Sequence, residues 1–441
     1  MTQKEALEIM KMGYNVFLTG EPGTGKTYVL SKYIEFLRKK NIPIGVTAST
    51  GIAATHLDGV TIDSWSGLGI RDELSDSDLE TLKHKFHLAQ RLQKTKVLII
   101  DEVSMISGKR LDLVDLILRN IRGKNLPFGG LQLILSGDLF QLPPVSTDRN
   151  KIDFLFSSKA WRNLDLRICY LTKAFRQKDR ELLDILMSIR ESKVDQNIID
   201  KLRQTGTNTF ENQITPAKLY THNIDVDAIN SQELEKLEGE QHEFNMIALG
   251  NEKLTTVLKN TCLAPEVLKM KKKALVMFVR NNYSDGYVNG SMGKVKGFDN
   301  NGDPVVELFS GKKVTVAPTH WTIMDGNKII AQITQIPLRL AWAITVHKSQ
   351  GMTLDVAELD LSKSFLLGMG YVALSRVRSL SGLRLLGFNE MALKVNPHVS
   401  EFDKYLLELS TETTKNLGKL GFLKKWLKKR KFMYFLTSPS V

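Results

Sequence analysis

A glycine-rich segment near the start of the chain has the residue types and spacing that bind phosphate. Gly20 is followed, after four residues, by Gly25, Lys26 and Thr27, which matches the pattern G-x-x-x-x-G-K-[ST]. Glycines at these places let backbone N–H groups converge on phosphate oxygens, and the dipole of the following helix attracts the negative charge. Lys26 is expected to reach the β- and γ-phosphates, and Thr27 a magnesium ion. The sequence therefore predicts a nucleoside triphosphate site.

The segments on either side of this loop predict the strand and the helix that position it. A short apolar run precedes the loop and an amphipathic pattern follows it. The apolar positions of that pattern are Val29, Leu30, Tyr33, Ile34 and Leu37. Further strands are expected at 44–48, 97–100 and 131–136, and a helix at 111–121. Buried strands that alternate with helices are typical of an α/β fold with a parallel sheet.

Two acids directly follow the strand expected at 97–100. Asp101 is expected to bind magnesium, directly or through water, and Glu102 to activate the attacking water. Gln141 lies in the run GDLFQLPPV, after another expected strand, where it could sense the γ-phosphate. Together with the glycine-rich loop, these residues indicate hydrolysis of the bound nucleotide.

Length, charge and cysteine content limit the class of protein. The 441 residues exceed the usual size of one core, so two or more domains are expected. The net charge of +13 favours a polyanionic partner, although a membrane surface fits as well. Cys169 and Cys262 lie far apart, which argues against a disulfide scaffold or a zinc site. Without a signal-peptide pattern or a long apolar run, the chain is expected to be soluble and cytoplasmic.

Composition shifts along the chain predict its domain organisation. A polar segment interrupts the first α/β unit, and short β-like runs with Asn-Gly turns interrupt a second one, which is typical of a small antiparallel barrel. The second unit is expected to begin with a strand at 166–171. The expected boundaries are 1–60 and 91–164 for the first unit, 61–90 for its insertion, 165–238 and 336–410 for the second unit, 239–335 for the barrel, and 411–441 for a basic tail.

Several runs, in order and at fitting spacing, resemble the motifs of superfamily 1B helicases. Besides the glycine-rich loop they are Gln3, VTASTGIAA (46–54), DEVSM (101–105), GDLFQLPPV (137–145), AFRQ (174–177), AITVHKSQG (343–351) and YVALSR (371–376). More narrowly, RNIRGKNLPFGGLQLILSGDLFQLPPV (119–145) resembles the signature of the PIF (petite integration frequency) DNA helicases. The resemblance covers about residues 1–410.

This resemblance implies a fold and an activity. The fold would have two RecA-like parallel-sheet domains, a wedge insertion at 61–90 and an SH3-like β-barrel insertion at 239–335. The activity would be that of an ATP- and Mg²⁺-dependent motor that moves 5′ to 3′ on single-stranded DNA and unwinds forked or duplex DNA as a monomer. Closure of the two domains would couple hydrolysis to movement. The sequence does not decide among forks, quadruplexes and RNA–DNA hybrids.

The resemblance also assigns nucleotide-site residues. Gln3 would recognise adenine, Gly351 would sit at the nucleotide, and Arg176 and Arg376 would reach the γ-phosphate as arginine fingers. Taken alone, either arginine would more often form a surface ion pair. The nucleotide-binding set is Gln3, Gly20, Gly23, Thr24, Gly25, Lys26, Thr27, Tyr28 and Gly351. The catalytic set is Lys26, Asp101, Glu102, Gln141, Arg176 and Arg376, with Thr27 and Asp101 as metal ligands.

Strand ends in both units are expected to contact DNA through phosphate contacts and base stacking. An ordinary capped turn would carry the same hydroxyl residues after the strand at 44–48, and Trp65 fits a core position as well as a stacking platform. The DNA-binding set is Thr47, Ser49, Thr50, Gly51, His56, Trp65, Thr221, His222, Asn223, Thr345 and His347.

Two places depart from the family pattern, and the tail lies outside it. Asp63 stands where the family usually carries histidine, and an acid beside a phosphate backbone is unfavourable. Met369 and Gly370 replace the more usual Gln and Ala. In the tail, a helix that packs on the motor is favoured over an accessory nucleic-acid contact or a membrane or partner helix. The residues expected to pack are Leu420, Leu423, Trp426 and Leu427.

Three other functions compete with this interpretation. A RecD-type helicase would be expected to lack the LPFGG-containing signature. A phosphate-loop switch or nucleotide kinase would not need a second α/β unit with Arg176 and Arg376. A single-strand binding module with incidental hydrolysis would show no directional movement.

Overall fold

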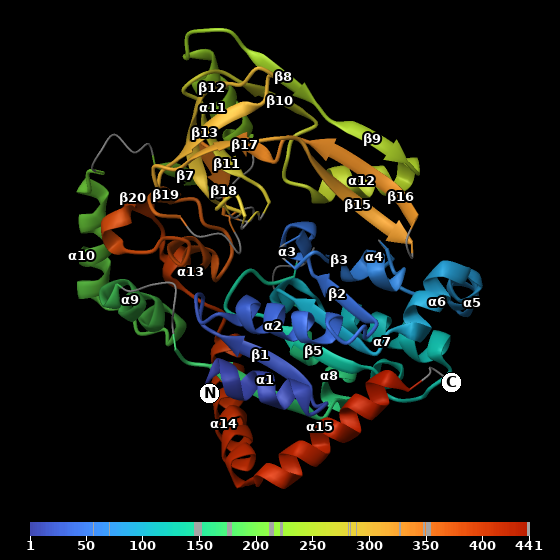
Figure 1. Cartoon of the computed structure of the whole chain (residues 1–441). Helices are drawn as coiled ribbons and strands as arrows, with labels where there is room; N and C mark the ends of the chain where they lie inside the picture. The colour runs from blue at the N-terminus through green and yellow to red at the C-terminus, as the bar shows by residue number, and fades with distance from the viewer. Residues whose placement is uncertain are drawn as a thin grey trace. The chain divides into compact units, whose positions relative to one another are not determined.

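The computed structural model describes most of the chain, and Figure 1 shows its course. The described residues are 1–55, 57–69, 71–144, 152–173, 179–210, 216–220, 224–280, 282, 284–287, 289–325, 328–346, 349 and 354–438. The chain divides into two units. The first comprises residues 1–176 and 396–441, and the second comprises residues 177–395.

The first unit is built on a six-stranded parallel sheet of order β3-β2-β4-β5-β1-β6. The strands are β1 (Asn15–Gly20), β2 (Ile44–Ala48), β3 (Val60–Thr61), β4 (Val97–Asp101), β5 (Gln132–Ser136) and β6 (Leu166–Leu171). The helices are α1 (Gln3–Lys11), α2 (Lys26–Arg38), α3 (Gly51–Thr55), α4 (Ile62–Ser66), α5 (Asp76–His84), α6 (Phe86–Lys94), α7 (Gly108–Arg122), α8 (Lys159–Asn163), α14 (Pro397–Lys419) and α15 (Phe422–Thr437). The strands expected at 44–48, 97–100 and 131–136, and the helix expected at 111–121, are confirmed.

One hydrophobic core holds this sheet to its helices. It joins α1, α2 and α15 to the strands through buried apolar side chains. Tyr33 of α2 belongs to this core and is fully buried, and its hydroxyl group donates to Gln132 Oε1 at 2.7 Å. The loss of solvent raises the pKa of this hydroxyl far above its usual range. The core fixes the start of α2, and therefore the glycine-rich loop, against the sheet.

The strand expected to open the second unit belongs to the first sheet instead. β6 pairs in parallel with β1 over six positions, from Asn15 with Leu166 to Gly20 with Leu171. The helix α14, expected in the second unit up to residue 410, also lies in the first unit. The backbone N–H of Tyr170 donates to Ser410 Oγ, which ties α14 to β6. The domain boundary at 164/165 was therefore wrong, because an apolar strand does not reveal which sheet it joins.

The polar segment at 61–90 forms helices rather than strands. α5 begins with a capping box in which Ser75 and Asp78 satisfy each other's backbone N–H groups. Leu82 of α5 and Leu88 of α6 are buried, and both helices pack on α7. The segment is thus a helical excursion from the sheet, as its loss of strand character predicted.

The basic tail comprises the end of α14 and the helix α15, and α15 packs on the first unit with a different face from the one expected. Phe432 and Leu436 are buried in the core, whereas Leu423 is 67% exposed and Trp426 45% exposed. A Cβ atom at Gly13 would meet the Phe432 ring, so this glycine lets the helix approach closely. Leu423, Trp426 and Leu427 were expected to pack on the motor, and this expectation is corrected because their side chains are exposed. Leu420 was expected to pack as well, and this is confirmed because it is partly buried against the core.

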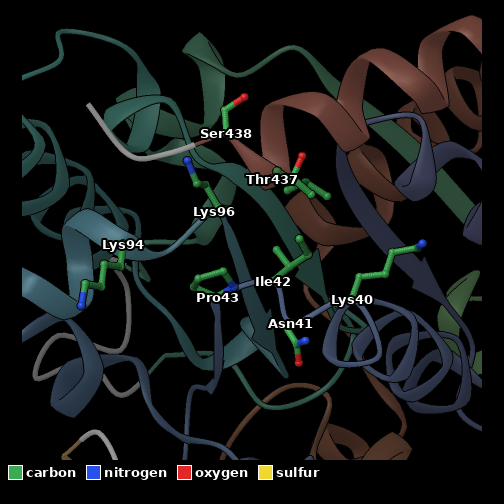
Figure 2. A pocket seen from close by; sticks show the side chains of 9 residues that line it. Lys40, Asn41, Ile42, Pro43, Lys94, Lys96, Thr437 and Ser438 are labelled. Carbon is green, nitrogen blue, oxygen red and sulfur yellow. The ribbon is translucent and has the colours of Figure 1, made fainter.

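The end of α15 closes a pocket of about 320 Å³ against the segments that precede β2 and β4. Lys96 is almost fully buried there, and its ammonium group lies 5.5 Å from the centre of the Phe435 ring. Figure 2 shows Lys40 and Lys94 extending away from each other on opposite sides of this pocket. The three cations therefore do not converge on one point.

The second unit contains a four-stranded parallel sheet of order β18-β7-β19-β20 and an antiparallel region. Its parallel strands are β7 (Ala217–Tyr220), β18 (Ala343–Thr345), β19 (Ala357–Leu361) and β20 (Leu383–Phe388). Its helices are α9 (Arg180–Arg190), α10 (Gln196–Gln204), α11 (Ile224–Glu235), α12 (Glu252–Thr261) and α13 (Met369–Leu374). The second α/β unit is thus confirmed, but without the strand at 166–171 and the helix α14, which belong to the first unit.

The antiparallel region falls into three sheets. Their orders are β14-β13-β12-β11-β17, β15-β16-β9 and β10-β8. The strands are β8 (His242–Asn245), β9 (Ile247–Gly250), β10 (Val267–Met270), β11 (Leu275–Phe278), β12 (Met292–Phe298), β13 (Pro304–Leu308), β14 (Lys313–Thr315), β15 (Thr319–Asp325), β16 (Lys328–Gln335) and β17 (Leu338–Leu340). The closely spaced antiparallel strands expected here are confirmed, and an SH3-like closure stays a prediction.

Among the described residues, every helix is too short or too polar to cross a lipid bilayer. Cys169 and Cys262 are buried free thiols, and burial raises the pKa of the Cys262 thiol to about 11.

Candidate nucleotide and nucleic-acid site

The glycine-rich loop joins β1 to α2 and depends on left-handed backbone at its glycines. Gly23 has φ 83° and Gly25, the residue before α2, has φ 85°. A side chain is strained in this region, so glycine is required. No side chain caps the first turn of α2, which leaves its N-terminal N–H groups facing the loop. This arrangement of amides and helix dipole suits an anion such as a phosphate group.

The Lys26 ammonium group folds back over the loop. It donates to the carbonyl oxygens of Gly20 at 2.7 Å and Glu21 at 3.1 Å. Thr27 and Tyr28, on the first turn of α2, are exposed. Lys26 therefore lies at the loop where phosphate is expected, and Thr27 faces solvent beside it.

Gln3 lies against the same loop. Its side-chain amide donates to the carbonyl oxygen of Thr24 at 2.9 Å. A Cβ atom at Gly25 would collide with Gln3 Nε2, so the two residues approach closely. Thr2 is the N-cap of α1 and forms a capping box with Glu5. This fixes Gln3 as the first residue of the helix. The structure thus brings Gln3 to the nucleotide loop, as expected.

The acid pair lies at the end of β4, two strands from β1 in the sheet. Asp101 is buried, and burial together with the neighbouring Glu102 charge raises the pKa of its carboxyl group to about 7, against the opposing effects of hydrogen bonds to the carboxylate and of the Lys26 charge. Glu102 has φ 51° and ψ 46°, a left-handed conformation that costs free energy in a non-glycine residue. A divalent cation would relieve the repulsion between the two carboxyl groups, so their chemistry fits a magnesium site.

Gln141 lies beyond β5 on the turn that follows Asp138. Its backbone N–H donates to the Asp138 carbonyl oxygen at 3.0 Å, and both side chains are buried. β5 separates β1 from β4 in the sheet, so this turn leaves the same edge as the glycine-rich loop and the acid pair. The expected position of Gln141 near the nucleotide agrees with this topology.

The expected DNA-binding residues at the end of β2 and just after it differ in their surroundings. Thr47 is fully buried and its hydroxyl group donates to the Ile99 carbonyl oxygen at 2.8 Å, so that side chain does not face a nucleic acid. Thr50 Oγ1 accepts from Ala53 N–H, which is the capping role that the sequence left open. Ser49 and Gly51 are half-buried at the strand end. The hydroxyl contact expected of Thr47 is therefore corrected.

Trp65 is a core residue in this structure. It is 4% exposed and lies against Gly45, where a Cβ atom would meet its ring at 2.7 Å. Arg91 Nη2 donates to the Trp65 carbonyl oxygen at 2.6 Å. The core alternative therefore holds, and the stacking role expected for this ring is corrected.

The acid at position 63 is neutralised by a residue that the sequence analysis missed. Arg110 Nε lies 2.6 Å from Asp63 Oδ1, in a partly buried pair. Arg110 also donates to the carbonyl oxygen of Gly69. No pattern in the sequence relates positions 63 and 110, since they come together only when α4 packs on α7. The pair explains how an acid is tolerated at this position.

In the second unit, the Arg376 side chain forms hydrogen bonds with residues close to it in the sequence. Its Nε donates to the Val372 carbonyl oxygen at 2.9 Å, and its Nη2 donates to Ser375 Oγ at 2.7 Å. Gly370 is required by the fold, because a Cβ atom there would collide with the carbonyl oxygen of Ala392. Met369 is fully buried, which agrees with the loss of a polar role at this position.

Thr345 ends β18 beside the end of β7. It pairs with Tyr220 in a parallel register, so both strands leave the sheet at one edge. Several expected site residues lie outside the described part of the chain, and they are His56, Arg176, Thr221, His222, Asn223, His347 and Gly351. Three of these, at 221–223, directly follow β7.

A parallel sheet with a glycine-rich phosphate loop after β1 and an acid pair after β4 defines the class of phosphate-loop nucleotide hydrolases. The family model of PIF1-like helicases matches residues 2–213. The chain is 43% identical to the ATP-dependent DNA helicase Pif1 of Psychrobacter sp. (strain PRwf-1), over 93% of this chain and 72% of that protein. It is 36% identical to the human ATP-dependent DNA helicase PIF1, over 91% of this chain and 62% of the human protein.

Solved structures of Pif1 helicases are similar to this chain in both fold and sequence. The Pif1 helicase from Candida albicans is 35% identical, with a TM-score of 0.77 over 92% of this chain and 98% of the solved one. Pif1 from Bacteroides sp in complex with ADP-AlF4 is 30% identical, with a TM-score of 0.79 over 92% and 96%. The chain belongs to the family of PIF1-like helicases, a family of ATP-dependent DNA helicases.

Proposed function

We propose that this chain hydrolyses ATP to move 5′ to 3′ along single-stranded DNA and to unwind duplex DNA. The observation that carries the proposal is the contact between the end of β2 and the acid pair. Ser49, an expected DNA-facing residue, donates to the carbonyl oxygen of Glu102, the expected general base. One edge of the sheet thus links an expected DNA-binding residue to an expected catalytic residue. A motor must couple these two activities, DNA binding and ATP hydrolysis.

The proposal gives each residue of the nucleotide site one task. Lys26 neutralises the β- and γ-phosphates, Gln3 selects adenine, and Glu102 accepts a proton from the attacking water. Thr27 and Asp101 would hold Mg²⁺, which supplies positive charge for the phosphate oxygens. Burial supports the choice of Asp101, because a carboxylate removed from water gains most from a bound cation. Gln141 would orient the attacking water.

The second unit would complete the site when the two units close on ATP. Arg376 and Arg176 are proposed as arginine fingers, a contribution worth about 10³ to 10⁵ in rate. To reach a phosphate, the Arg376 guanidinium group must exchange the bonds that it makes with Val372 and Ser375. This exchange is itself a means to couple nucleotide state to the second unit.

DNA is the proposed partner on both units. Pif1 from Bacteroides has been solved bound to single-stranded DNA, and another structure describes unwinding of forked DNA by two coordinating Pif1 helicases. For this chain we propose contacts by Ser49 and Gly51, with the backbone N–H groups after β2 binding phosphate. The contact expected of the Thr345 side chain is corrected, because Thr345 is as buried as Thr47. Monomeric action, the wedge role of 61–90, and an SH3-like role of 239–335 belong to the same proposal.

Strand displacement tests the proposal. Two duplexes, one with a 5′ single-stranded tail and one with a 3′ tail, are incubated with the full chain, ATP and magnesium. Displacement of the 5′-tailed duplex alone is the expected result, and the Lys26→Ala variant, which lacks the phosphate-binding cation, serves as the control. Displacement of only the 3′-tailed duplex would overturn the polarity. Hydrolysis of ATP without displacement of either would favour a non-translocating switch.

A further inference from the structure

A buried arginine in the second unit has a guanidinium nitrogen without a hydrogen bond. Arg339 lies on β17 opposite Met277 of β11, and its side chain is 9% exposed. Its Nε is fully buried and has no partner among the residues that the structure describes. Burial lowers the pKa of this guanidinium group, and the negative charge of Asp227 opposes that effect in part. A buried cation of this kind is costly unless a ligand pairs with it.

Arg339 lines a cavity of about 400 Å³ that α11, β10 and β17 enclose. Six of its thirteen lining residues are apolar, among them Leu234 and Leu268, which are buried, and Leu340, which follows Arg339. Three exposed charged residues, the acids Asp227 and Glu235 and the cation Lys269, also line it. The cavity therefore offers one buried cation beside apolar side chains, with a net negative charge among its exposed lining residues.

These features select the chemistry of a ligand. A guanidinium group accepts a carboxylate through two parallel hydrogen bonds, and Nε–H is one of the donors in that geometry. An apolar group attached to the carboxylate would fill the space between Leu234 and Leu268. A nucleic-acid backbone fits poorly, because the exposed acids Asp227 and Glu235 outnumber the exposed Lys269 and would repel successive phosphates.

We propose that the Arg339 cavity binds a carboxylate carried by an apolar group. None of its residues belongs to the sites described above for ATP or DNA, so this is a separate site. The chemistry is shared by two sources, a small aliphatic carboxylic acid and the free carboxyl end of an apolar peptide. Either would pair the buried cation and bury its apolar part in the same cavity.

Methyl NMR of the full chain tests the site, because leucines of the lining report on it. N-acetyl-L-leucine is titrated against its neutral analogue, N-acetyl-L-leucinamide. We expect saturable shifts of the Leu234, Leu268 and Leu340 methyl signals with the acid, and at least about tenfold weaker binding of the amide, since charge-assisted hydrogen bonds are lost. The peptide acetyl-Gly-Gly-Leu with a free carboxyl end distinguishes the sources. Tighter binding than N-acetyl-L-leucine supports a peptide end, and equal binding supports a small acid.

Two variants complete the test. Arg339→Met keeps a stem of similar shape, and it should abolish binding of the acid while ATP hydrolysis persists. Asp227→Asn removes an exposed negative charge from the lining, and it should tighten binding of the acid roughly twofold or more without affecting the amide. Equal binding of acid and amide would overturn the proposal, as would unchanged binding in Arg339→Met or no tightening in Asp227→Asn. Tighter binding of inorganic phosphate with the same methyl shifts would also overturn it, in favour of a phosphate site.

Discussion

The Ser49 hydroxyl group donates to the carbonyl oxygen of Glu102 at 2.7 Å, while the Ser49 N–H donates to the carbonyl oxygen of Asp101 at 3.2 Å. Glu102 has the left-handed backbone conformation noted above, which the surrounding contacts must hold in place. A ligand that moves the end of β2 therefore acts on the backbone of both acids through two hydrogen bonds. This relationship gives the proposed coupling of DNA to hydrolysis a physical path within one unit.

The first prediction concerns that hydrogen bond. Ser49→Ala removes the hydroxyl contact to Glu102 but keeps the backbone bond to Asp101. We expect stimulation of ATP hydrolysis by single-stranded DNA to fall by about tenfold, which corresponds to the free energy of one such bond, while hydrolysis without DNA changes little. Steady-state ATPase assays with and without an oligonucleotide measure both rates.

Ser188→Ala is the matched control. Its hydroxyl group likewise donates to a carbonyl oxygen, that of Asp184, but within helix α9 of the second unit. This variant should keep normal stimulation. If both variants lose stimulation equally, or if Ser49→Ala loses none, the hydrogen bond to Glu102 has no special part in coupling.

The second prediction separates nucleotide binding from DNA binding. Lys26→Ala removes the cation that lies over the glycine-rich loop, so ATP hydrolysis should fall to background. Single-stranded DNA should still bind with nearly unchanged affinity, because its proposed contacts at Ser49 and Gly51 lie elsewhere. Fluorescence anisotropy of a labelled oligonucleotide measures the affinity without nucleotide. Loss of DNA binding equal to the loss of hydrolysis would refute this separation.

The third prediction uses the perturbed carboxyl group. Burial and Glu102 raise the folded-state pKa of Asp101 to about 7, well above its usual value. The folded protein therefore holds this proton more tightly than the unfolded chain. The stability that this provides is complete below about pH 4 and is lost as the pH rises to about 7. Without metal, the Tm of Asp101→Asn minus that of the parent should rise over this range, on the order of a few degrees.

Magnesium provides the control for that experiment. Near pH 7.5, Mg²⁺ with ADP should raise the Tm of the parent more than that of Asp101→Asn, since a cation stabilises the ionised carboxylate. A Tm difference that is flat between pH 4 and pH 7.5 would show that Asp101 is not perturbed as described.

The sequence predicted the elements around the nucleotide better than the contacts between distant elements. The strands and the loop at Lys26 were predictable because glycine spacing and apolar periodicity are local signals. The place of β6 was not, since a buried apolar strand pairs equally well on either sheet. The pair of Asp63 with Arg110 depends on helix packing across 47 positions, which no local pattern records. Thr47 was assigned to DNA from its place near the end of a strand, whereas its hydroxyl group turns inward to Ile99.

The fourth prediction tests the correction at Trp65. Because the ring is buried against Gly45, Trp65→Ala should lower the free energy of unfolding by about 3–5 kcal/mol. The folded variant should bind single-stranded DNA with an affinity close to that of the parent. Chemical denaturation and anisotropy measure the two effects separately. A stacking role would give the opposite result, with stability kept and about 1–3 kcal/mol of binding free energy lost.

The fifth prediction concerns how α15 is held on the first unit. Phe432 packs over Gly13 and is 8% exposed, whereas Trp426, on the same helix, is 45% exposed. Phe432→Ala should cost about 3 kcal/mol or more and release the helix, because a buried ring leaves a cavity. Trp426→Ala should change stability by no more than about 0.5 kcal/mol.

Limited trypsin digestion reads out this release, because α15 carries Lys424, Lys425 and Lys428 on its first turns. Cleavage within α15 should be fast in Phe432→Ala and as slow in Trp426→Ala as in the parent, since a protease needs locally unfolded chain. Fast cleavage in both variants would mean that Trp426 also holds the helix. This would contradict the prediction that an exposed tryptophan contributes little to docking of α15. Slow cleavage in both would place the docking free energy in other contacts, such as the ion pair of Lys429 with Glu8.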